Sequence, residues 1–372
     1  MGASAGPRGA LDDESATGEE MTAPILLSVI VPVYQGQQVL PLVLEALRAS
    51  DLPRDRWELI VVDDASTDST ATIAAIYADR VVSLTPLPRG PAFARNRGVD
   101  VAAGEWVVFV DADVRVHTDT LRQFAAVSES DPTVEAIFGA YDDAPPAAGL
   151  VSQYRNLLHR YTHLTSAGEA DSFWAGCGAV RRSTFEAVGG FDAARYPKPQ
   201  IEDIELGYRI RDTGGRILLR PEIQGTHLKR WTFWRAVKVD IFDRGLPWVR
   251  LLLERDRLTD SAQLNLKRGE RLKAVSVVAA CLLLAVAILA GWAWPVGVAI
   301  VLFGLVAFAN RAQFAWFRER RGLRFAVGTI PLQFLYYVLS STSVALGVGD
   351  RVWRRAFGPR LGGPTFLKGD TE

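Results

Sequence analysis

A long stretch without charge places the strongest limit on how this chain can fold. Residues 274–309 are 36 residues without a charged side chain, and the sequence GWAWP interrupts them at residues 291–295. About 20 apolar residues are enough for a helix to cross a bilayer. Because a helix of a soluble protein does not need so long an uncharged run, we predict a hairpin of two membrane helices, residues 274–290 and 292–309, with tryptophans at the membrane interface.

A third uncharged segment, residues 325–348, admits two arrangements. It contains Pro331 and a polar cluster at residues 340–343. Residues 311–324 and 351–360 on either side of it are rich in arginine, and positively charged loops stay on the cytoplasmic side of a membrane. A re-entrant or interfacial segment keeps both on that side, whereas a third membrane span separates them. The sequence leaves both arrangements open.

The remaining segments predict where the chain lies in the cell. Residues 1–23 lack the basic start and the apolar core of a signal peptide, so we predict a disordered tail and a cytoplasmic domain after it. Residues 231–273 are predicted to be an amphipathic juxtamembrane segment, and residues 349–372 a basic tail. The formal net charge of zero argues against general nucleic-acid binding, whereas local basic segments suit phosphates or anionic membrane lipid. Together these patterns predict a multi-pass protein of the inner cell membrane.

The first half of the chain alternates apolar strands with helical segments. Runs of consecutive apolar residues predict parallel strands buried on both faces, here at residues 25–33, 58–62, 80–84 and 106–110. Two later helices and two short strands are expected at residues 151–164, 203–212, 216–219 and 222–226. The pattern predicts an α/β domain over residues 24–230. It would have a mixed, mainly parallel sheet, helices on both faces and a ligand crevice at the carboxyl ends of the strands.

Acidic side chains follow two of these strands at the predicted crevice. Asp63 and Asp64 end the second strand, and Asp111 and Asp113 follow the strand at residues 106–110. Carboxylates at alternate positions bind Mg²⁺ or Mn²⁺ together with a diphosphate, because hard cations prefer oxygen ligands. We therefore predict a Mg²⁺ or Mn²⁺ site at Asp111 and Asp113, although so short a motif is also compatible with an ordinary surface loop.

Five motifs follow one another along the α/β domain. They are SVIVPVYQG (residues 28–36), ELIVVDDASTDST (58–70), GPAFARNRGVDVAAGEWVVFVDADV (90–114), GCGAVRRSTFEAVGGFD (176–192) and EDIELGYRIRDTG (202–214). In order and spacing they resemble the family 2 glycosyltransferases of the GT-A (Rossmann-like) fold, in their membrane-anchored bacterial form. The resemblance covers about residues 27–230 and implies transfer of a sugar from a nucleotide-sugar donor.

The resemblance also implies which residues bind the donor. In chain order they are Pro32, Tyr34, Val62, Asp64, Arg95, Asn96, Asp111, Ala112, His227 and Arg230. The first four would form the pocket for the nucleotide base, the next two would flank the diphosphate, and the last two would bind pyrophosphate or metal. For the last two, an interfacial segment at the bilayer surface is the alternative. Many members have Asn-Glu where this chain has Gln35 and Gly36, which leaves the base open.

The pair Glu202 and Asp203 is similar to the catalytic Glu-Asp motif of that family. The resemblance implies that Asp203 acts as the general base, which takes the proton of the acceptor hydroxyl as that hydroxyl attacks the sugar. On its position alone, Asp203 could equally stabilise the start of a helix through the helix dipole. Glu205 and Arg209, four residues apart, are expected to form a helical salt bridge.

The sequence as a whole therefore predicts an inverting, metal-dependent transferase with a polyprenyl phosphate, glycolipid or glycan acceptor at the cytoplasmic membrane face. One alternative is a nucleotidyltransferase, but the glycine-rich signature with a catalytic Lys or Arg is missing from residues 31–38. The other is a non-catalytic binding module, against which the intact acidic motifs argue. Cys177 and Cys281 predict neither a disulfide nor a metal site. The sugar, base, exact acceptor and oligomeric state depend on loop shapes and are not readable.

Overall fold

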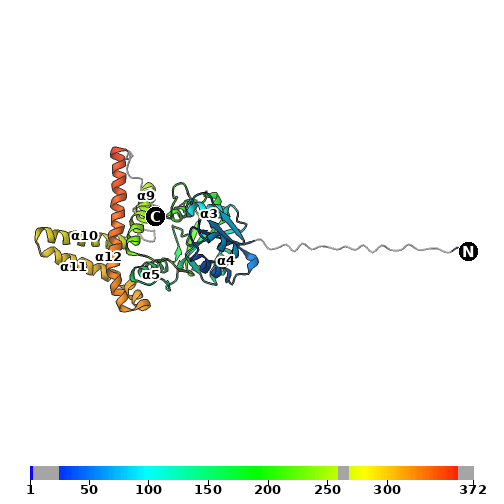
Figure 1. Ribbon diagram of the computed structural model, residues 1–372. Helices are drawn as coiled ribbons and strands as arrows, with labels where there is room; N and C mark the ends of the chain where they lie inside the picture. Colours follow the sequence, from blue (N-terminus) through cyan, green and yellow to red (C-terminus); the bar gives the residue numbers. More distant parts are fainter. Residues whose placement is uncertain (3–24, 259–267, 359–372) are drawn as a thin grey trace.

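The computed structural model describes residues 1–2, 25–258 and 268–358. Our predictions for the tail at residues 3–23, for residues 259–267 of the juxtamembrane segment and for the basic tail beyond residue 358 lie outside the described residues. Figure 1 shows three parts in space: an α/β domain, a long helix beside it, and a helical hairpin that projects from the far side of that helix.

The α/β domain is built on one mixed sheet of nine strands, which confirms the predicted fold class. The strands are β1 Leu27–Val33, β2 Trp57–Asp63, β3 Arg80–Ser83, β4 Trp106–Val110, β5 Val114–Val116, β6 Val134–Tyr141, β7 Gly168–Glu169, β8 Cys177–Arg181 and β9 Arg216–His227. The first half, in the order β3-β2-β1-β4, is parallel throughout. β8 then pairs antiparallel with β4 and with β6, and β9 and β5 complete the sheet.

Helices cover both faces of this sheet. In chain order they are α1 Leu40–Arg48, the 3₁₀ turn η1 Arg54–Arg56, α2 Thr70–Tyr77, α3 Pro91–Val99, α4 Thr120–Ser130, α5 Leu150–Leu164, α6 Arg182–Ala187 and α7 Glu202–Asp212. One apolar core packs α1, α2 and α4 against the sheet, and a second packs α3, α6 and α7 against its other face. Strands β1, β2 and β4 are buried along their whole length, as their consecutive apolar residues predict.

The end of the domain differs from the prediction of two short strands. The chain forms one strand, β9, in which residues 220–223 bulge away from β6 between Phe138 and Ala140. Pro221 lies in this bulge, and a proline has no N–H to donate to a neighbouring strand. The ladder is therefore interrupted there while the chain stays extended, which explains why the sequence pattern predicted a break.

Beyond β9 the chain continues as one helical run. It consists of α8 Phe233–Lys238, the π-helical segment η2 Val239–Gly245 and α9 Leu246–Glu254. Pro247 cannot donate to the carbonyl of Asp243, so a regular α-helical hydrogen-bond ladder cannot pass through this point. A wider π-helical turn resolves the conflict, and such turns are frequent at functional sites.

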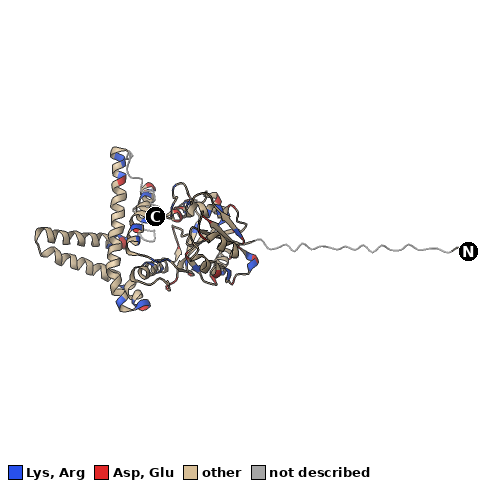
Figure 2. Ribbon diagram, in the orientation of Figure 1, with Lys and Arg blue, Asp and Glu red and all other residues tan. Residues whose placement is uncertain are grey.

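The C-terminal helices form the rest of the structure. α10 Arg268–Ala290 and α11 Trp294–Ala309 make the hairpin, and α12 Arg311–Phe357 crosses its base (Figure 1). In the described part of the chain, α10 and α12 are long and apolar enough to cross a membrane, whereas α11 has 16 residues. Figure 2 shows that the projecting part of the hairpin carries no Lys, Arg, Asp or Glu.

The helix α12 lies between the hairpin and the α/β domain. Its backbone breaks at Gly322, where φ is 82°, so the predicted third segment falls in the part after this break. After this break, one face of α12 buries the polar side chains of Thr329, Gln333 and Ser343, and Gln313, before the break, is buried as well. On this face Gln333 Oε1 accepts hydrogen bonds from the hydroxyl of Tyr154 (2.9 Å) and from the amide of Gln313 (2.7 Å). This face therefore contacts protein.

Candidate active site

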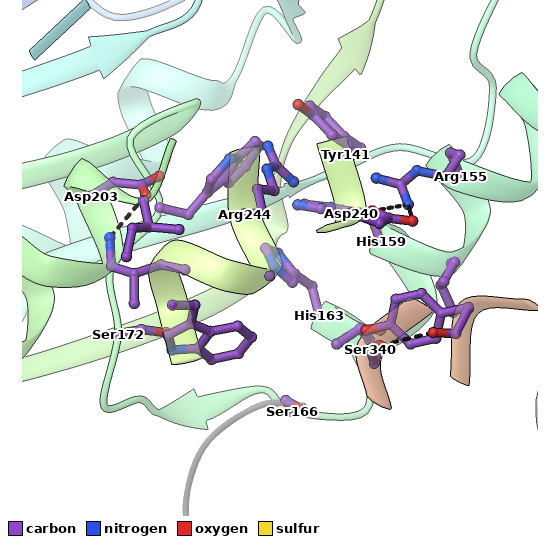
Figure 3. A pocket seen from close by; sticks show the side chains of 18 of the residues that line it. Tyr141, Arg155, His159, His163, Ser166, Ser172, Asp203, Asp240, Arg244 and Ser340 are labelled. Atoms are coloured by element: carbon purple, nitrogen blue, oxygen red, sulfur yellow. Dashed lines mark hydrogen bonds and ion pairs between the residues drawn. The ribbon is translucent and has the colours of Figure 1, made fainter. Parts of the chain in front are cut away.

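A cavity of about 420 Å³ lies where the α/β domain, η2 and α12 meet. Figure 3 shows it with side chains of α5, α7, η2 and α12 around it. Four of the predicted site residues line this cavity: Asp111, Asp113, Asp203 and His227. They come from the turn after β4, the start of α7 and the end of β9, so the fold brings together residues that are far apart in the sequence.

Asp111 and Asp113 project from the turn that follows β4. Their side chains keep 33% and 30% of their surface exposed. The main-chain N–H of Asp111 donates to the carbonyl of Gly176 (3.1 Å), and the carbonyl of Asp113 accepts from the N–H of Leu228 (2.8 Å). These bonds fix the turn to β8 and β9, so both carboxylates are held at the wall of the cavity.

His227 faces Asp113 with a defined ring nitrogen. The amide nitrogen of Asn156 donates to the carbonyl of Ser152 (3.1 Å), which leaves its oxygen beside Nδ1 of His227 at 2.6 Å. Nδ1 therefore donates to this oxygen, and Nε2 is the ring nitrogen that faces Asp113. Nε2 lies 3.7 Å from Oδ2 of Asp113. If a metal replaces the proton on Nε2, His227 and Asp113 could bind one cation together.

The donor set therefore fits a divalent cation in part. Burial raises the pKa of Asp113, but the neighbouring His227 and Lys229 outweigh this and hold the pKa below its usual range. Asp113 is thus ionised at neutral pH and can bind a cation. Within residues 25–258 and 268–358, no three His, Cys, Asp or Glu side chains form a complete metal site. Phosphate oxygens and water would have to supply the remaining ligands.

Arg95 links the predicted metal ligand to the predicted catalytic pair. Its buried guanidinium donates to Oδ1 of Asp111 (2.7 Å) and to Oε1 of Glu202 (2.9 Å). The other oxygen of Glu202 accepts from the main-chain N–H of Gln200 (2.9 Å). Both oxygens of Glu202 are therefore used inside the protein. Glu202 and Arg95 are placed to position other groups, and we assign neither of them to contact with a substrate.

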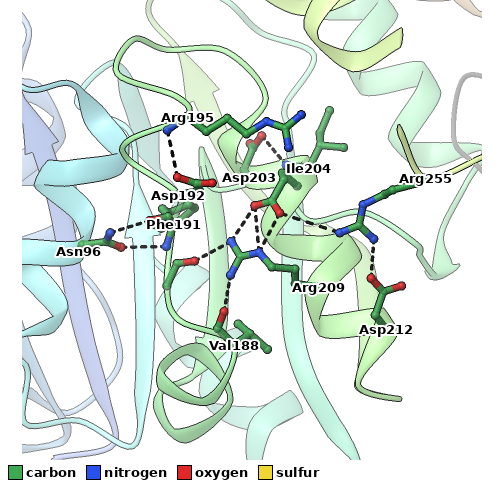
Figure 4. Close-up of polar contacts among 12 residues, drawn as sticks. Asn96, Val188, Phe191, Asp192, Arg195, Asp203, Ile204, Arg209, Asp212 and Arg255 are labelled. Atoms are coloured by element: carbon green, nitrogen blue, oxygen red, sulfur yellow. Dashed lines mark hydrogen bonds and ion pairs between the residues drawn. The ribbon is translucent and has the colours of Figure 1, made fainter. Parts of the chain in front are cut away.

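Asp203 is the carboxylate at the start of α7 that remains open to the cavity. Its Oδ2 accepts from the N–H of Ala175 (3.1 Å) and its Oδ1 from the N–H of Ile204 (2.8 Å). Burial and the charge of Glu202 raise its pKa to about 6, even though Arg95 acts in the opposite direction. Figure 4 shows Asp203 with its bond to Ile204, beside the network around Arg209, whose predicted salt bridge with Glu205 is present at 2.7 Å.

The predicted base pocket lies at the carboxyl ends of β1 and β2. Tyr34 is 52% exposed and free to contact a ligand, whereas Pro32 and Val62 are buried within the strands. The two oxygens of Asp64 accept from the main-chain N–H groups of Arg89 (2.8 Å) and Gly90 (2.7 Å), so Asp64 also fixes the loop before α3. Ala112, between the two aspartates, packs partly against the core.

Two of the predicted donor ligands have other surroundings. The side-chain amide of Asn96 donates to the carbonyl of Phe191 (2.8 Å) and accepts from its N–H (2.9 Å), so it holds a loop and is not free for a diphosphate (Figure 4). Arg230 is exposed and does not line the cavity, whereas Lys229 does, with its Nζ 3.9 Å from Asp113. Alternation along the extended chain after His227 is the signal that could have found Lys229.

An aromatic column behind the carboxylates was not predicted. The rings of Tyr141 and His227 stack at 4.2 Å, and His159 lies 4.4 Å from Tyr141 and 4.9 Å from Trp174. His159 and His163 stand one turn apart on α5, 4.0 Å between ring centres. Three of the four histidines therefore meet at one wall of the cavity. Their spacing in α5 was visible in the sequence, but their meeting with His227 was not.

Cys177 lies beside the site, fully buried at the start of β8. Burial and the charge of Asp111 raise the pKa of its thiol to about 12, so it is not a nucleophile at neutral pH. Cys281 is exposed on α10, and both cysteines are free, as predicted.

The fold and the carboxylates at its crevice define this chain by class as a protein with a GT-A domain. Residues 28–189 match the family described as Glycosyl transferase family 2, and this domain belongs to that family. The mannosyltransferase PcManGT from Pyrobaculum calidifontis, solved with GDP-Man and Mn²⁺, has the same fold. It aligns with 87% of this chain and 90% of its own, at a TM-score of 0.53 and 21% identity.

Curated relatives match a shorter part of the chain. The poly(ribitol-phosphate) β-N-acetylglucosaminyltransferase TarS of Staphylococcus aureus is 38% identical over 103 residues, which are 27% of this chain and 18% of TarS. A PGL/p-HBAD biosynthesis glycosyltransferase of Mycobacterium tuberculosis is 35% identical over 125 residues, 32% of this chain and 47% of the relative. The matches thus span less than half of the length of either relative.

Proposed function

We propose that this chain is an inverting, metal-dependent glycosyltransferase that moves a sugar from a nucleotide-diphosphate sugar to a membrane-associated acceptor. The observation that carries the proposal is that Asp111, Asp113 and Asp203 line one cavity at the carboxyl edge of a GT-A sheet. Membership of the domain in family 2 supports sugar transfer over nucleotidyl transfer, and the open carboxylate of Asp203 supports catalysis over mere binding.

The donor would lie across the carboxyl ends of β1, β2 and β4. Tyr34 and Asp64 are at the base end, and Asp111, Asp113 and His227 face the diphosphate. A bound Mg²⁺ or Mn²⁺ would neutralise the charge that develops on the leaving diphosphate. Arg95 keeps Asp111 in place and pairs with the buried carboxylate of Glu202, which would otherwise lie without a counter-charge.

Asp203 would act as the base. It takes the proton of the acceptor hydroxyl while that oxygen forms the bond to the anomeric carbon and the bond to the diphosphate breaks. A pKa of about 6 suits this task, because the carboxylate is ionised at neutral pH and still basic enough to accept a proton.

The C-terminal helices would hold the enzyme at the inner face of a membrane. Large apolar side chains are exposed along both arms of the hairpin, among them Leu282, Ile288, Ile300 and Phe308. If this hairpin enters the bilayer, α12, which crosses its base, lies along the membrane surface. The polar face that α12 turns to the α/β domain supports this interfacial position over a third span.

Binding of nucleotide sugars provides the test of the catalytic proposal. Purified protein would be warmed with UDP-, GDP- and dTDP-sugars, with Mn²⁺, with Mg²⁺ or with EDTA, because a ligand of the folded state raises the melting temperature. We expect stabilisation by one nucleotide, dependent on the metal and lost in Asp113→Asn. Sugar transfer that proceeds fully in EDTA would contradict the metal role.

Cysteine labelling tests the membrane arrangement. Single cysteines replace Ala293, Glu319 and Gly349 in a chain without Cys177 and Cys281, and intact cells are treated with an impermeant thiol reagent. We expect labelling at position 293 from outside and protection at positions 319 and 349, because the hairpin tip faces out and α12 stays inside. Labelling at position 349 would show a third span instead.

A further inference from the structure

The π-helical segment η2 places an arginine in the cavity without a partner. Three Arg and Lys side chains line the cavity: Arg155, Lys229 and Arg244. Arg155 is paired with Asp240, and Lys229 lies 3.9 Å from Asp113. Arg244 has no ion pair or hydrogen bond within the described ranges 25–258 and 268–358. A cation that the protein leaves unpaired in a cavity is available to an anionic ligand.

The position of Arg244 relates it to the acceptor side of the site. Figure 3 shows Arg244 between Asp203 and Tyr141. Arg244 is therefore near the proposed base, while Lys229 and His227 stand beside Asp113 on the donor side.

The same cavity extends from Asp203 to the helix α12. Its far wall is made by Gln333, Tyr336, Ser340 and Ser343 of α12. η2 packs directly on this wall, because a Cβ at Gly245 would overlap the side chain of Ser343. Asp203, Arg244 and this wall of α12 line one cavity, so a ligand can extend from Arg244 to α12 without leaving it.

We propose that Arg244 binds a phosphate in the headgroup of a lipid acceptor, next to the hydroxyl that Asp203 deprotonates. This inference rests on the proposed function and names the acceptor class for it. A guanidinium offers several N–H donors in a fork that matches phosphate oxygens. The lipid tail would leave along α12 toward the hairpin. An Arg at this point would then select acceptors that carry an anionic headgroup.

Binding of simple amphiphiles to the full chain in neutral nanodiscs tests the inference. The probes are dodecyl phosphate, dodecanol and inorganic phosphate, and affinity is measured for wild type, Arg244→Gln and Arg235→Gln. Arg235 is a matched control because it is exposed on α8, in the same helical run, and does not line the cavity. We expect Arg244→Gln to weaken dodecyl phosphate binding about ten- to a hundredfold, as for loss of a charged hydrogen bond.

The control results separate the possible outcomes. Arg235→Gln should bind dodecyl phosphate as wild type does, and dodecanol should bind equally weakly to all three proteins. Equal dodecyl phosphate affinity in wild type and Arg244→Gln overturns the inference, and so does an equal loss in both variants. If inorganic phosphate binds as tightly as dodecyl phosphate, the site takes a free phosphate and the lipid part is wrong. Metal-dependent nucleotide binding, measured in the same samples, reports separately on the proposed function and should be unchanged in both variants.

Discussion

Replacing Asp203 by Asn should stabilise the protein while it abolishes transfer. The pKa of Asp203 is raised from 3.8 to about 6, so the folded state binds the proton more tightly than the unfolded state does. A carboxyl group whose pKa is higher in the folded than in the unfolded state lowers the free energy of unfolding as the pH rises from the unfolded-state pKa to the folded-state pKa. The whole cost is present above about pH 6. Two pKa units correspond to about 3 kcal/mol at neutral pH.

The amide recovers most of this cost. Asn keeps one oxygen acceptor but turns its NH₂ group toward one of the two N–H donors, of Ala175 or Ile204, which costs about 1 kcal/mol. The net gain at pH 8 is about 1–2 kcal/mol, or roughly 2–8 °C in melting temperature for a domain of this size. At pH 4.5 the wild-type carboxyl is largely protonated, so most of the gain disappears.

The assay compares melting temperatures of wild type and Asp203→Asn at pH 8 and pH 4.5, in the same detergent. Asp192→Asn serves as the control, because Asp192 is an exposed carboxylate in the neighbouring loop (Figure 4). We expect the difference in melting temperature between variant and wild type to depend on pH for Asp203→Asn and not for Asp192→Asn. Destabilisation of Asp203→Asn by the same amount at both pH values would refute the argument from burial.

Three further predictions follow from the geometry of the site. The kcat of wild type should fall about tenfold per pH unit below pH 6, the pKa of Asp203, and a pH–rate profile flat to pH 5 would argue against a base there. Asn156→Ala should weaken Mn²⁺ binding in the presence of nucleotide about 10- to 100-fold, because His227 loses the partner that orients its ring. Unchanged Mn²⁺ affinity in calorimetry would exclude His227 as a metal ligand. Gly245→Ala should lower the free energy of unfolding by about 1–3 kcal/mol, because the added methyl group overlaps Ser343. Gly349→Ala should not lower it, because the space around Gly349 is open. Equal effects of the two variants in denaturant titrations would contradict the close packing of η2 on α12.

The sequence predicted the parallel half of the sheet well, for a physical reason. β1, β2 and β4 are buried on both faces, so most of their residues are apolar and the apolar signal is nearly continuous. β9 was split in the prediction because Pro221 reads as a break, although the strand only bulges there. Local patterns thus show which residues are buried, but they do not show whether a strand pairs with its neighbour again after a bulge.

The site was predictable where chemistry is local and not where it depends on distant contacts. The aspartates follow a strand directly, so their common edge was visible. Arg95 and Glu202 are 107 residues apart, and their pairing could not be read from spacing. The choice between Lys229 and Arg230 depends on where β9 ends, and the use of Asn96 depends on the position of Phe191. Gly245 and Pro247 are the residues from which an irregular turn at η2 could have been predicted.

The position of α12 determines how far the reacting groups lie from the membrane surface. α12 is both a wall of the cavity and, in our proposal, the helix that rests on the membrane surface. A helix with its side chains is about 10–12 Å across. The reacting hydroxyl would therefore stand about one helix diameter above the surface, within reach of a headgroup of one or two units. A long glycan would have to fold back to present its end, so acceptors of increasing headgroup length should lose activity beyond that size.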